Sequence, residues 1–276
     1  MPINNQLQKE ALGLIAGNGK FPILFAKCAK QKQDLRIVAI AITGDTSKML
    51  KPLVDELNWV RPGELGKMLE ILKEKGIRKV AMAGQVNPKN LFDKRISLDN
   101  ELKNILENIK DKKADTIFKA IASRLENQGL EIINSTTYVT EYLPKLGVLT
   151  KRCPTEREWE DIRFGKTIAK AVALLDIGQT VVVKEKAILA IEALEGTNAT
   201  ILRGARIAGF GAVVVKVSRP NQDMRFDIPV VGLKTIEILL KVKASCLAIE
   251  AEKTLFLDKE KSLELANKHN LCVIAT

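Results

Sequence analysis

The sequence LGLIAGNG, residues 12–19, places a short apolar run directly before a glycine turn. Pro22 and the apolar residues after it are typical of a helix that begins there, because proline is tolerated in the first helical turn. A buried strand that leads through a tight turn into a helix is the repeating unit of a parallel sheet covered by helices. This stretch therefore predicts an α/β fold.

Strand and helix patterns continue to alternate through the first half of the chain. Apolar runs mark the strands, and apolar residues at helical spacing mark the helices. The predicted strands are 37–42, 57–60, 79–83 and 130–133, and the predicted helices are 63–75 and 98–128. We therefore predict a Rossmann-like parallel sheet in an N-terminal domain over residues 1–135, which binds a nucleotide or another substrate.

Glycine turns follow two of these predicted strands. In parallel sheets of this kind, ligands gather at the carboxyl ends of the strands. We therefore expect Gly17, Asn18 and Gly19, together with Gly84 and Gln85, to lie at that edge and to contact the ligand. A dinucleotide-binding turn, G-x-G-x-x-G, would need glycine at position 22, which is proline. The first turn thus favours a phosphate or a nucleotide other than NAD, with a purely structural turn as the equal alternative.

The second half of the chain has a different pattern. Proline, glycine and charged residues between 136 and 160 are typical of a linker. Beyond it we predict a C-terminal catalytic α/β domain over residues 161–276. Its predicted helices are 155–175, which begins in the linker, and 232–243; its predicted strands are 180–184, 187–193, 212–217 and 273–275, with 246–250 and 254–257 as a further strand pair.

Composition limits the classes of protein that this chain can belong to. Its 276 residues exceed one average domain of roughly 150 residues. A hydrophobic content of 46% and a charged content of 28% exclude a disordered or collagen-like chain. The formal charge of +11 favours anionic partners such as phosphates, nucleic acid or an acidic membrane surface. No apolar run reaches the ~20 residues of a membrane span, and residues 1–10 lack the apolar core of a secretory signal, so we expect a cytoplasmic protein.

Histidine and cysteine are too scarce for several kinds of active site. The one histidine lies in the polar stretch 266–270, which is typical of a helix end. It excludes a zinc site with two histidine ligands in one chain and is poorly placed for a catalytic triad. The four cysteines are widely spaced and form no C-x-x-C pair. A hydrolase of this composition must use carboxylates, a magnesium ion, or both.

The segment 216–232 has the densest set of charged residues. Asp223 and Asp227 lie four residues apart among Lys216, Arg219 and Arg225. Carboxylates can hold magnesium, and cations can neutralise phosphate oxygens. The combination fits a magnesium-bound diphosphate, whereas the alternative is a solvated loop whose charges pair with one another.

A second candidate group precedes a predicted helix. Glu195 and Gly196 lead into it, with Thr197 as the expected N-cap. Helix N-termini attract anions, so this group either holds substrate or only caps the helix. Gln179, which precedes the strand at 180–184, is expected to face the ligand as well.

Five segments, in order and at family-like spacing, resemble the motifs of a known enzyme family. They are LIAGNG at 14–19, AGQV at 83–86, LDIGQ at 175–179, EALEGTN at 192–198 and KVSRPNQDMRFDIP at 216–229. Together they resemble the LpxI-type UDP-2,3-diacylglucosamine pyrophosphatases of lipid A biosynthesis, over nearly the whole chain. The resemblance implies two α/β domains, joined by a linker, that hold a lipid-bearing substrate between them.

The resemblance also implies a reaction and its residues. The reaction is magnesium-dependent hydrolysis of UDP-2,3-diacylglucosamine to UMP and 2,3-diacylglucosamine 1-phosphate (lipid X), with water directed to the phosphorus on the sugar side. The pattern Arg-x-Asp-x-Pro places the catalytic aspartate at Asp227, with Asp223 as the second carboxylate and Mg²⁺ bound to both. Whether Asp227 binds the ion or acts as the general base stays open. The implied substrate-binding residues are Gly17, Asn18, Gly19, Gly84, Gln85, Gln179, Glu195, Gly196, Thr197, Arg219 and Arg225.

Two other interpretations compete with this one. A sugar-nucleotide transferase or dehydrogenase would use the glycine turn, but the third glycine and a catalytic Tyr-Lys pair are missing. A nucleic-acid-binding module would suit the positive charge, but no recognition helix or aromatic RNA-binding motif supports it, so we expect no nucleic-acid partner. A lipid substrate is compatible with peripheral contact with the inner membrane. The sequence does not decide whether the chain forms a homodimer.

Overall fold

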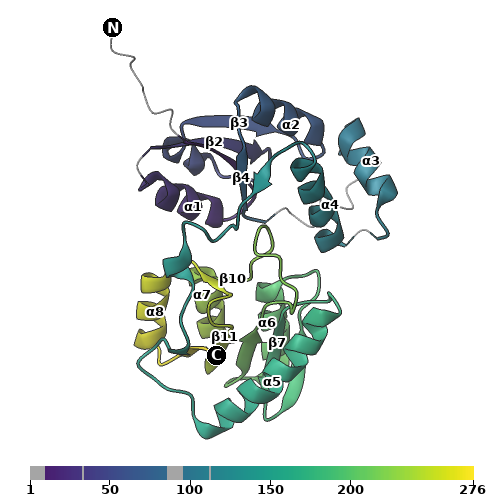
Figure 1. The fold of residues 1–276 in the computed structure, drawn as a ribbon. Coiled ribbons are helices and arrows are strands. Elements are labelled where there is room, and N and C mark those ends of the chain that lie inside the picture. Colours follow the sequence, from purple (N-terminus) through teal and green to yellow (C-terminus); the bar gives the residue numbers. More distant parts are fainter. Residues whose placement is uncertain (1–9, 33, 86–95, 112) are drawn as a thin grey trace. The chain divides into compact units, whose positions relative to one another are not determined.

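The computed structural model describes residues 10–32, 34–85, 96–111 and 113–276 (Figure 1). The chain forms two compact units. Unit 1 contains the chain up to Val139 together with the segment Met224–Asp227, and unit 2 contains Thr140–Asp223 and Ile228–Thr276. One short piece of the second half of the sequence therefore belongs to the unit that the first half builds.

Unit 1 is built on a five-stranded parallel sheet with the strand order β3-β2-β1-β4-β5. Its strands are β1 (Glu10–Ala16), β2 (Leu35–Ile42), β3 (Glu56–Val60), β4 (Lys79–Ala83) and β5 (Glu131–Ile132). Its helices are α1 (Phe21–Lys30), η1 (Lys48–Leu53), α2 (Leu65–Glu74), α3 (Asn100–Asn108) and α4 (Ala114–Glu126). The parallel α/β fold expected from the first strand and its glycine turn is confirmed.

The charged stretch 98–128, expected to be one helix, consists of two helices, α3 and α4. Asp99 caps α3, where its carboxylate accepts a 2.9 Å hydrogen bond from the Leu102 amide. On α4, Ala122 and Leu125 are buried in the core of unit 1. Apolar residues recur at helical spacing on both sides of the break, so the spacing alone does not reveal it.

Unit 2 is built on a six-stranded sheet with the order β6-β13-β11-β9-β7-β8. The strands β13, β11 and β9 are parallel to one another, whereas β6, β7 and β8 run antiparallel to their neighbours. These strands are β6 (Gly147–Val148), β7 (Thr180–Lys184), β8 (Ala187–Ile191), β9 (Val213–Lys216), β11 (Cys246–Ile249) and β13 (Cys272–Ala275). The helices are η3 (Thr140–Tyr142), α5 (Glu156–Leu174), α6 (Thr197–Ala208), α7 (Leu233–Lys241) and α8 (Lys259–Lys268).

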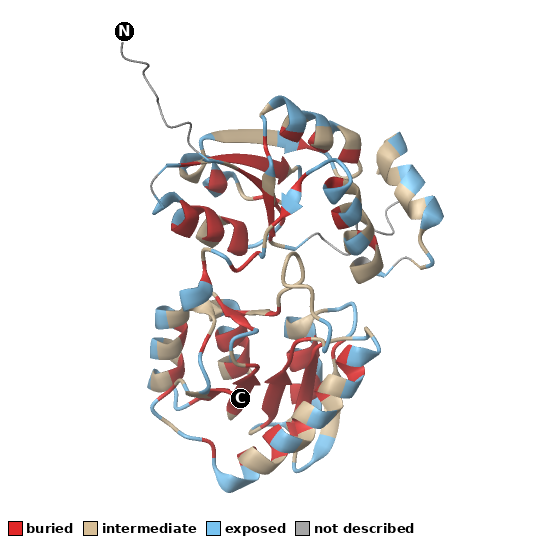
Figure 2. Ribbon diagram, in the orientation of Figure 1, coloured by how far each residue is buried: buried red, intermediate tan, exposed pale blue. Residues whose placement is uncertain are grey.

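Helices cover both faces of this second sheet. Along β7, Val181 and Val183 pack with Ile162 of α5, and Val182 between them packs with Ile201 of α6. The side chains alternate because successive residues of a strand point to opposite faces. Helices α7 and α8 contribute to the same core as α6, and the strands between the helices are buried (Figure 2). The second α/β domain is thereby confirmed.

The expected pairing of 246–250 with 254–257 is wrong. Strand β11 pairs with β9 and β13, and β12 (Leu255–Phe256) pairs with β10 (Val230–Val231) in a separate parallel ribbon. Proximity in sequence suggested a hairpin, but both segments run parallel to partners that are more distant in the chain.

The linker expected at 136–160 does not match the structure, because residues from Thr140 onward belong to unit 2. Strand β6 pairs with β13 through Val148 and Ile274, and the Leu149 amide donates a 2.9 Å hydrogen bond to the Val273 carbonyl. Proline, glycine and charge mark irregular backbone, and a two-residue edge strand leaves no apolar pattern to contradict them. Among the described residues, no helix has the length and hydropathy of a membrane span.

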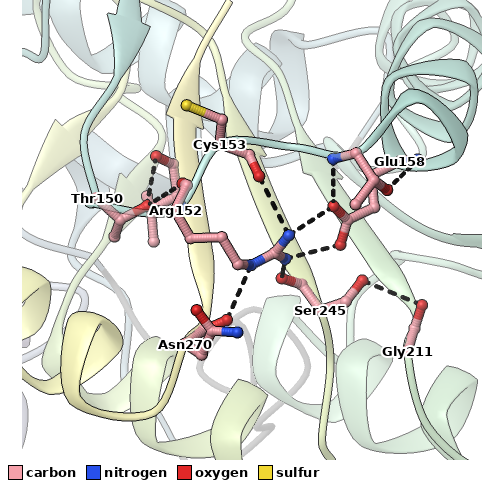
Figure 3. A network of polar contacts seen from close by, with 9 residues as sticks. Thr150, Arg152, Cys153, Glu158, Gly211, Ser245 and Asn270 are labelled. Atoms are coloured by element: carbon pink, nitrogen blue, oxygen red, sulfur yellow. Dashed lines mark hydrogen bonds and ion pairs between the residues drawn. The ribbon is translucent and has the colours of Figure 1, made fainter.

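An ion pair between Arg152 and Glu158 stabilises the chain between β6 and α5 (Figure 3). The guanidinium donates to the two carboxylate oxygens at 2.8 and 2.7 Å, and its Nε donates to the Asn270 carbonyl at 2.9 Å. Glu158 also accepts from the Thr155 amide in a capping box at the start of α5. Burial raises the pKa of the Glu158 carboxyl, but hydrogen bonds from Arg152 and Thr155 outweigh it and hold the pKa at about 2.

We expect this carboxylate to make unit 2 sensitive to acid. A carboxyl with a lowered pKa in the fold stabilises it above the ordinary pKa of 4.5, and that contribution is lost as the pH falls toward 2. In Glu158→Gln, the drop in Tm between about pH 6 and about pH 3 should be smaller than in the unchanged protein. The exposed Glu156→Gln is the control and should keep the full drop; equal acid sensitivity in all three proteins would contradict the assignment.

Candidate active site

The two glycine motifs of unit 1 meet at the carboxyl edge of its sheet. The Asn18 amide donates to the Gln85 carbonyl at 2.7 Å, and the Gln85 amide donates back to the Asn18 carbonyl at 3.1 Å. Gly17, Asn18 and Gly19 after β1 therefore lie beside Gly84 and Gln85 after β4. The structure brings these five residues together at the edge where the sequence predicted them.

Glycine is required at this junction for close approach. Gly84 has φ +93°, and a Cβ there would lie 2.6 Å from the Asn18 carbonyl oxygen. A Cβ at Gly17 would lie 2.7 Å from the Gln85 carbonyl oxygen. Helix α1 begins just beyond, at Phe21, without a side-chain cap. The positive end of its dipole thus lies at this edge, which suits a phosphate.

The segment Met224–Asp227 packs against α4 and the chain after β5. Ser135 holds this segment, since its amide and its hydroxyl both donate to the Met224 carbonyl, at 3.0 and 2.7 Å. The Phe226 ring stacks on Phe118 of α4 with the centroids 6.0 Å apart. These contacts join residues that are about 90 to 110 positions apart in the sequence, so no local pattern could have predicted them.

Arg225 adds an ion pair to this anchor. Its Nη1 lies 2.6 Å from Glu126 Oε1 at the end of α4, and its guanidinium lies 5.9 Å from the centroid of the Phe226 ring. Arg225 was expected to bind substrate phosphates, which stays a prediction; in the structure its guanidinium pairs with Glu126. Asp227 thus directly follows a segment that is held at Met224, Arg225 and Phe226.

Loss of the ring stack should release this segment. In Phe118→Ala, amide hydrogen exchange of residues 224–227 should become roughly tenfold faster, because a stacked aromatic pair contributes on the order of 1 kcal/mol. Phe226→Ala should have the same effect, and the double variant should add little to either single one. Lys119→Ala, on the same helix, serves as the control. Additive effects of the two phenylalanine variants would show that the rings do not act as a pair.

A row of polar side chains lies at the carboxyl edge of β9 and β11 in unit 2. Because β7 and β8 are antiparallel there, the start of β7, the end of β8 and the start of α6 reach the same edge. Buried members of the row are Gln179, Thr180, Glu192, Lys216, Ser218 and Glu250. Buried polar groups need partners, and these residues largely supply them to one another.

Lys216 is the centre of this row. Its Nζ lies 2.8 Å from Thr197 Oγ1, 3.3 Å from Thr180 Oγ1 and 3.6 Å from Glu192 Oε2. The Thr197 hydroxyl donates to the other Glu192 oxygen at 2.7 Å. Burial raises the pKa of the Glu192 carboxyl, but the Lys216 charge and the threonine hydroxyls lower it more, so the group is a carboxylate. An ammonium that is almost completely shielded from water interacts strongly with any further anion.

Lys170 and Glu250 form a second ion pair in the row, in which Glu250 is buried and Lys170 is partly exposed. The Lys170 Nζ lies 2.6 Å from Glu250 Oε2 and donates to the Ser218 carbonyl at 2.9 Å. The Ser218 amide and hydroxyl donate to the same carboxylate at 2.7 and 2.8 Å. Burial raises the pKa of Glu250, but these donors overcome it and hold the pKa at about 2. Glu250 is therefore no proton acceptor near neutral pH and serves to orient Ser218 and Lys170.

The substrate-binding residues predicted for the second domain lie beside this row. The Gln179 side chain donates to Gln222 Oε1 at 3.1 Å. Glu195 pairs with Arg203 at 2.6 Å, and Arg219 pairs with Asp176 at 3.1 Å. The expectation that Thr197 is the N-cap of the helix is wrong. Gly196 occupies that position with φ +81°, and the Thr197 side chain turns to Glu192 instead.

Asp223 and Asp227, expected to share a metal ion, are divided between the units. Asp223 belongs to unit 2 and Asp227 to unit 1. Within the described ranges, no three His, Cys, Asp or Glu residues are grouped so that they could hold a metal ion. A complete metal site made by protein side chains is therefore not present in this part of the chain.

Sequence reasoning assigned no role to several residues of these two edges. Glu192, Lys170, Ser218 and Glu250 are examples in unit 2, and Ser135 is one in unit 1. One signal was available: a polar residue placed directly after an apolar strand, such as Glu250 after 246–249, lies at a strand end. Lys170 gave no such signal, because a lysine on a helix is usually solvated.

Comparisons with known proteins cover almost the whole chain. The family model described as the LpxI N-terminal domain matches residues 11–142, and the model described as the LpxI C-terminal domain matches residues 145–274. UDP-2,3-diacylglucosamine pyrophosphatase LpxI of Caulobacter vibrioides is 29% identical over 275 residues, which are 95% of this chain and 96% of that protein.

Among solved structures, the biotin carboxylase domain of Hydrogenobacter thermophilus 2-oxoglutarate carboxylase matches with a TM-score of 0.26 and 14% identity. The match covers 72% of this chain and 40% of that one, and it supports no conclusion about fold or function.

Proposed function

Because the chain belongs to the LpxI family, we propose that it hydrolyses the diphosphate of UDP-2,3-diacylglucosamine to UMP and 2,3-diacylglucosamine 1-phosphate, a step of lipid A biosynthesis. The observation that carries the proposal is the match to the Caulobacter vibrioides enzyme along 95% of the chain. The segments 14–19, 175–179 and 192–198, which resemble the family motifs, and residues 83–85 of the motif at 83–86 adjoin the two sheet edges described above.

The polar row of unit 2 supports a diphosphate substrate. Lys216 and Lys170 hold positive charge at the carboxyl edge of the sheet, and the N-terminus of α6 adds a partial positive charge beside Lys216. Neutralising phosphoryl oxygens is the main requirement of phosphoryl transfer. Thr180 and Thr197 keep the Lys216 ammonium in place before substrate arrives, so little reorganisation is needed on binding.

Magnesium enters the proposal as an ion shared between protein and substrate. Magnesium is commonly held by one or two carboxylates together with substrate phosphates and water, not by an all-protein cage. With no group of three acidic, His or Cys residues in the described part of the chain, the proposal is that Asp227 and Asp223 hold Mg²⁺ together with the diphosphate. The ion would neutralise phosphate charge and lower the pKa of a water molecule.

Asp227 is the proposed catalytic residue. Its carboxylate accepts the proton of the attacking water, or orients that water, while an oxygen–phosphorus bond forms at the sugar-side phosphorus. The bond from that phosphorus to the bridging oxygen breaks, and UMP leaves with the bridging oxygen. Ser135 and the Phe118–Phe226 stack would position Asp227 by holding its backbone.

Product analysis in labelled water tests the proposal. The full chain is incubated with UDP-2,3-diacylglucosamine and magnesium in water enriched in heavy oxygen, and the products are followed by phosphorus NMR and mass spectrometry. We expect UMP without label, labelled 2,3-diacylglucosamine 1-phosphate, and loss of turnover with EDTA. No UMP would contradict the function, label in UMP would contradict attack at the sugar-side phosphorus, and full activity in EDTA would contradict the magnesium requirement.

We propose that the enzyme is cytoplasmic and meets its lipid substrate by peripheral contact with the inner membrane. A homodimer would be detected by light scattering of the purified chain.

A further inference from the structure

The outward face of α6 has an unusual composition. Residues Leu202, Arg203, Arg206, Ile207 and Phe210 form one stripe along the helix and its end, because each lies three or four residues from at least one other member. Ile207 and Phe210 are 67% and 69% exposed, and Leu202 is 36% exposed. No acidic residue occurs from 197 to 211. We call these five residues the α6 stripe.

The two helices that cover the same face of the sheet are different. On α7, the exposed Lys234 and Glu237 form an ion pair three residues apart. On α8, the exposed residues include Glu260, Lys261 and Glu264. Mixed charge is the usual pattern of a solvated helix face, and the α6 stripe departs from it by combining large apolar side chains with arginine.

Cations surround the apolar end of the α6 stripe. The Lys184 Nζ lies 4.8 Å from the centroid of the Phe210 ring and donates to the carbonyls of Ala208 and Phe210 at 2.9 and 3.0 Å. The Gly211 amide donates to the Lys243 carbonyl, which brings the exposed Lys243 next to Phe210. Throughout the described ranges, neither Arg206 nor Lys243 has a carboxylate within ion-pair distance. Within the stripe Arg203 pairs with Glu195 at 2.6 Å, so the positive charge that no carboxylate offsets at ion-pair distance is that of Arg206 and the adjacent Lys243.

We propose that the α6 stripe docks the enzyme on an anionic lipid bilayer, with α6 lying along the membrane surface. Exposed Leu, Ile and Phe side chains bury into the boundary between headgroups and acyl chains, while neighbouring Arg and Lys side chains bind anionic headgroups. The stripe lies on the exposed side of a helix, so it suits a flat surface better than a single extended chain. A formal charge of +11 adds a long-range attraction to the same surface.

This orientation has a consequence within unit 2. Helix α6 begins at Thr197, whose hydroxyl contacts Lys216, and it ends beside Phe210. A helix that lies on the bilayer therefore carries the polar row of unit 2 to the membrane surface, where a substrate with acyl chains resides. The docking itself does not depend on the reaction proposed above.

Vesicle flotation tests the proposal. The full chain is mixed with vesicles of phosphatidylethanolamine containing about 30% phosphatidylglycerol, or with phosphatidylcholine vesicles, at about 0.1 M salt. We expect binding to the anionic vesicles only, and a partition coefficient at least roughly tenfold lower for Ile207→Ser/Phe210→Ser and for Arg206→Glu. Leu146→Ser removes a side chain that is 78% exposed elsewhere in unit 2, and it should bind as the unchanged protein does.

Each other outcome would overturn the docking surface. Absence of binding by the unchanged chain, or equal loss in Leu146→Ser, would show that the α6 stripe is not a membrane surface. A shift from dimer to monomer in Ile207→Ser/Phe210→Ser, measured by light scattering with no change in vesicle binding, would assign the stripe to contact between two copies. Turnover of detergent-dispersed substrate should be unchanged in this double variant, so failure of docking and failure of the proposed reaction are distinguishable.

Discussion

Replacing Asp227 with alanine should reduce the turnover of UDP-2,3-diacylglucosamine by roughly a thousandfold while substrate binding is nearly retained. A carboxylate that takes a proton from water, or holds the ion that activates it, acts mainly in the transition state. In the proposed complex, ground-state contacts would come from other residues, such as Lys216 and the glycine turn after β1. The kcat is measured from UMP release, and the Kd for intact substrate is measured by calorimetry on the inactive variant.

The matched control for this variant removes an ion pair of the same segment. Glu126→Gln removes the carboxylate that pairs with Arg225 at 2.6 Å. It should lower the Tm and leave the kcat nearly unchanged. If Asp227 were only a structural partner of Arg225, Asp227→Ala would behave in the same way. A loss of only a few-fold in kcat for Asp227→Ala would contradict its catalytic role and direct attention to Asp223 or Glu195.

Lys216→Met should destabilise unit 2 by about 3–5 kcal/mol, because it leaves the buried Glu192 carboxylate without its cation. The side chains of Lys216 and Glu192 are only 7% and 11% exposed, so water cannot replace the lost partner. The free energy of unfolding is measured with urea at neutral pH. Lys186→Met, which breaks the half-exposed pair with Glu160 at 3.2 Å, should cost no more than about 1 kcal/mol.

A double variant separates stability from catalysis at this pair. Lys216→Met/Glu192→Leu removes both charges and should recover most of the stability that Lys216→Met loses, because a buried ion pair is often replaceable by apolar residues. It should remain inactive, since the ammonium that neutralises phosphate is gone. A double variant that is stable and fully active would show that the pair is structural and that substrate does not use Lys216.

Local sequence predicted those parts of the fold that depend on neighbours in the chain. The apolar run 12–16 and its glycine turn predicted a parallel sheet, and the sheet of unit 1 has β1 at its centre. Gly17 and Gly84 were expected at one edge because each follows a strand, and parallel strands end together. The break between α3 and α4 and the folding of 140–160 onto unit 2 were not predicted, because both depend on packing that leaves no periodic signal.

The sequence by itself determined that this chain has two α/β domains, that one histidine limits its chemistry, and that five ordered segments resemble one enzyme family. Only the tertiary structure decided which partners the charged residues take. Arg225 pairs with Glu126, at a separation of 99 residues, and Lys216 pairs with Glu192. The physical reason is that a buried charge must find its counter-charge wherever the fold brings one, and spacing along the chain does not encode that distance. For the same reason the anchoring of Asp227 in unit 1 follows from a ring stack and a serine that are far away in the sequence.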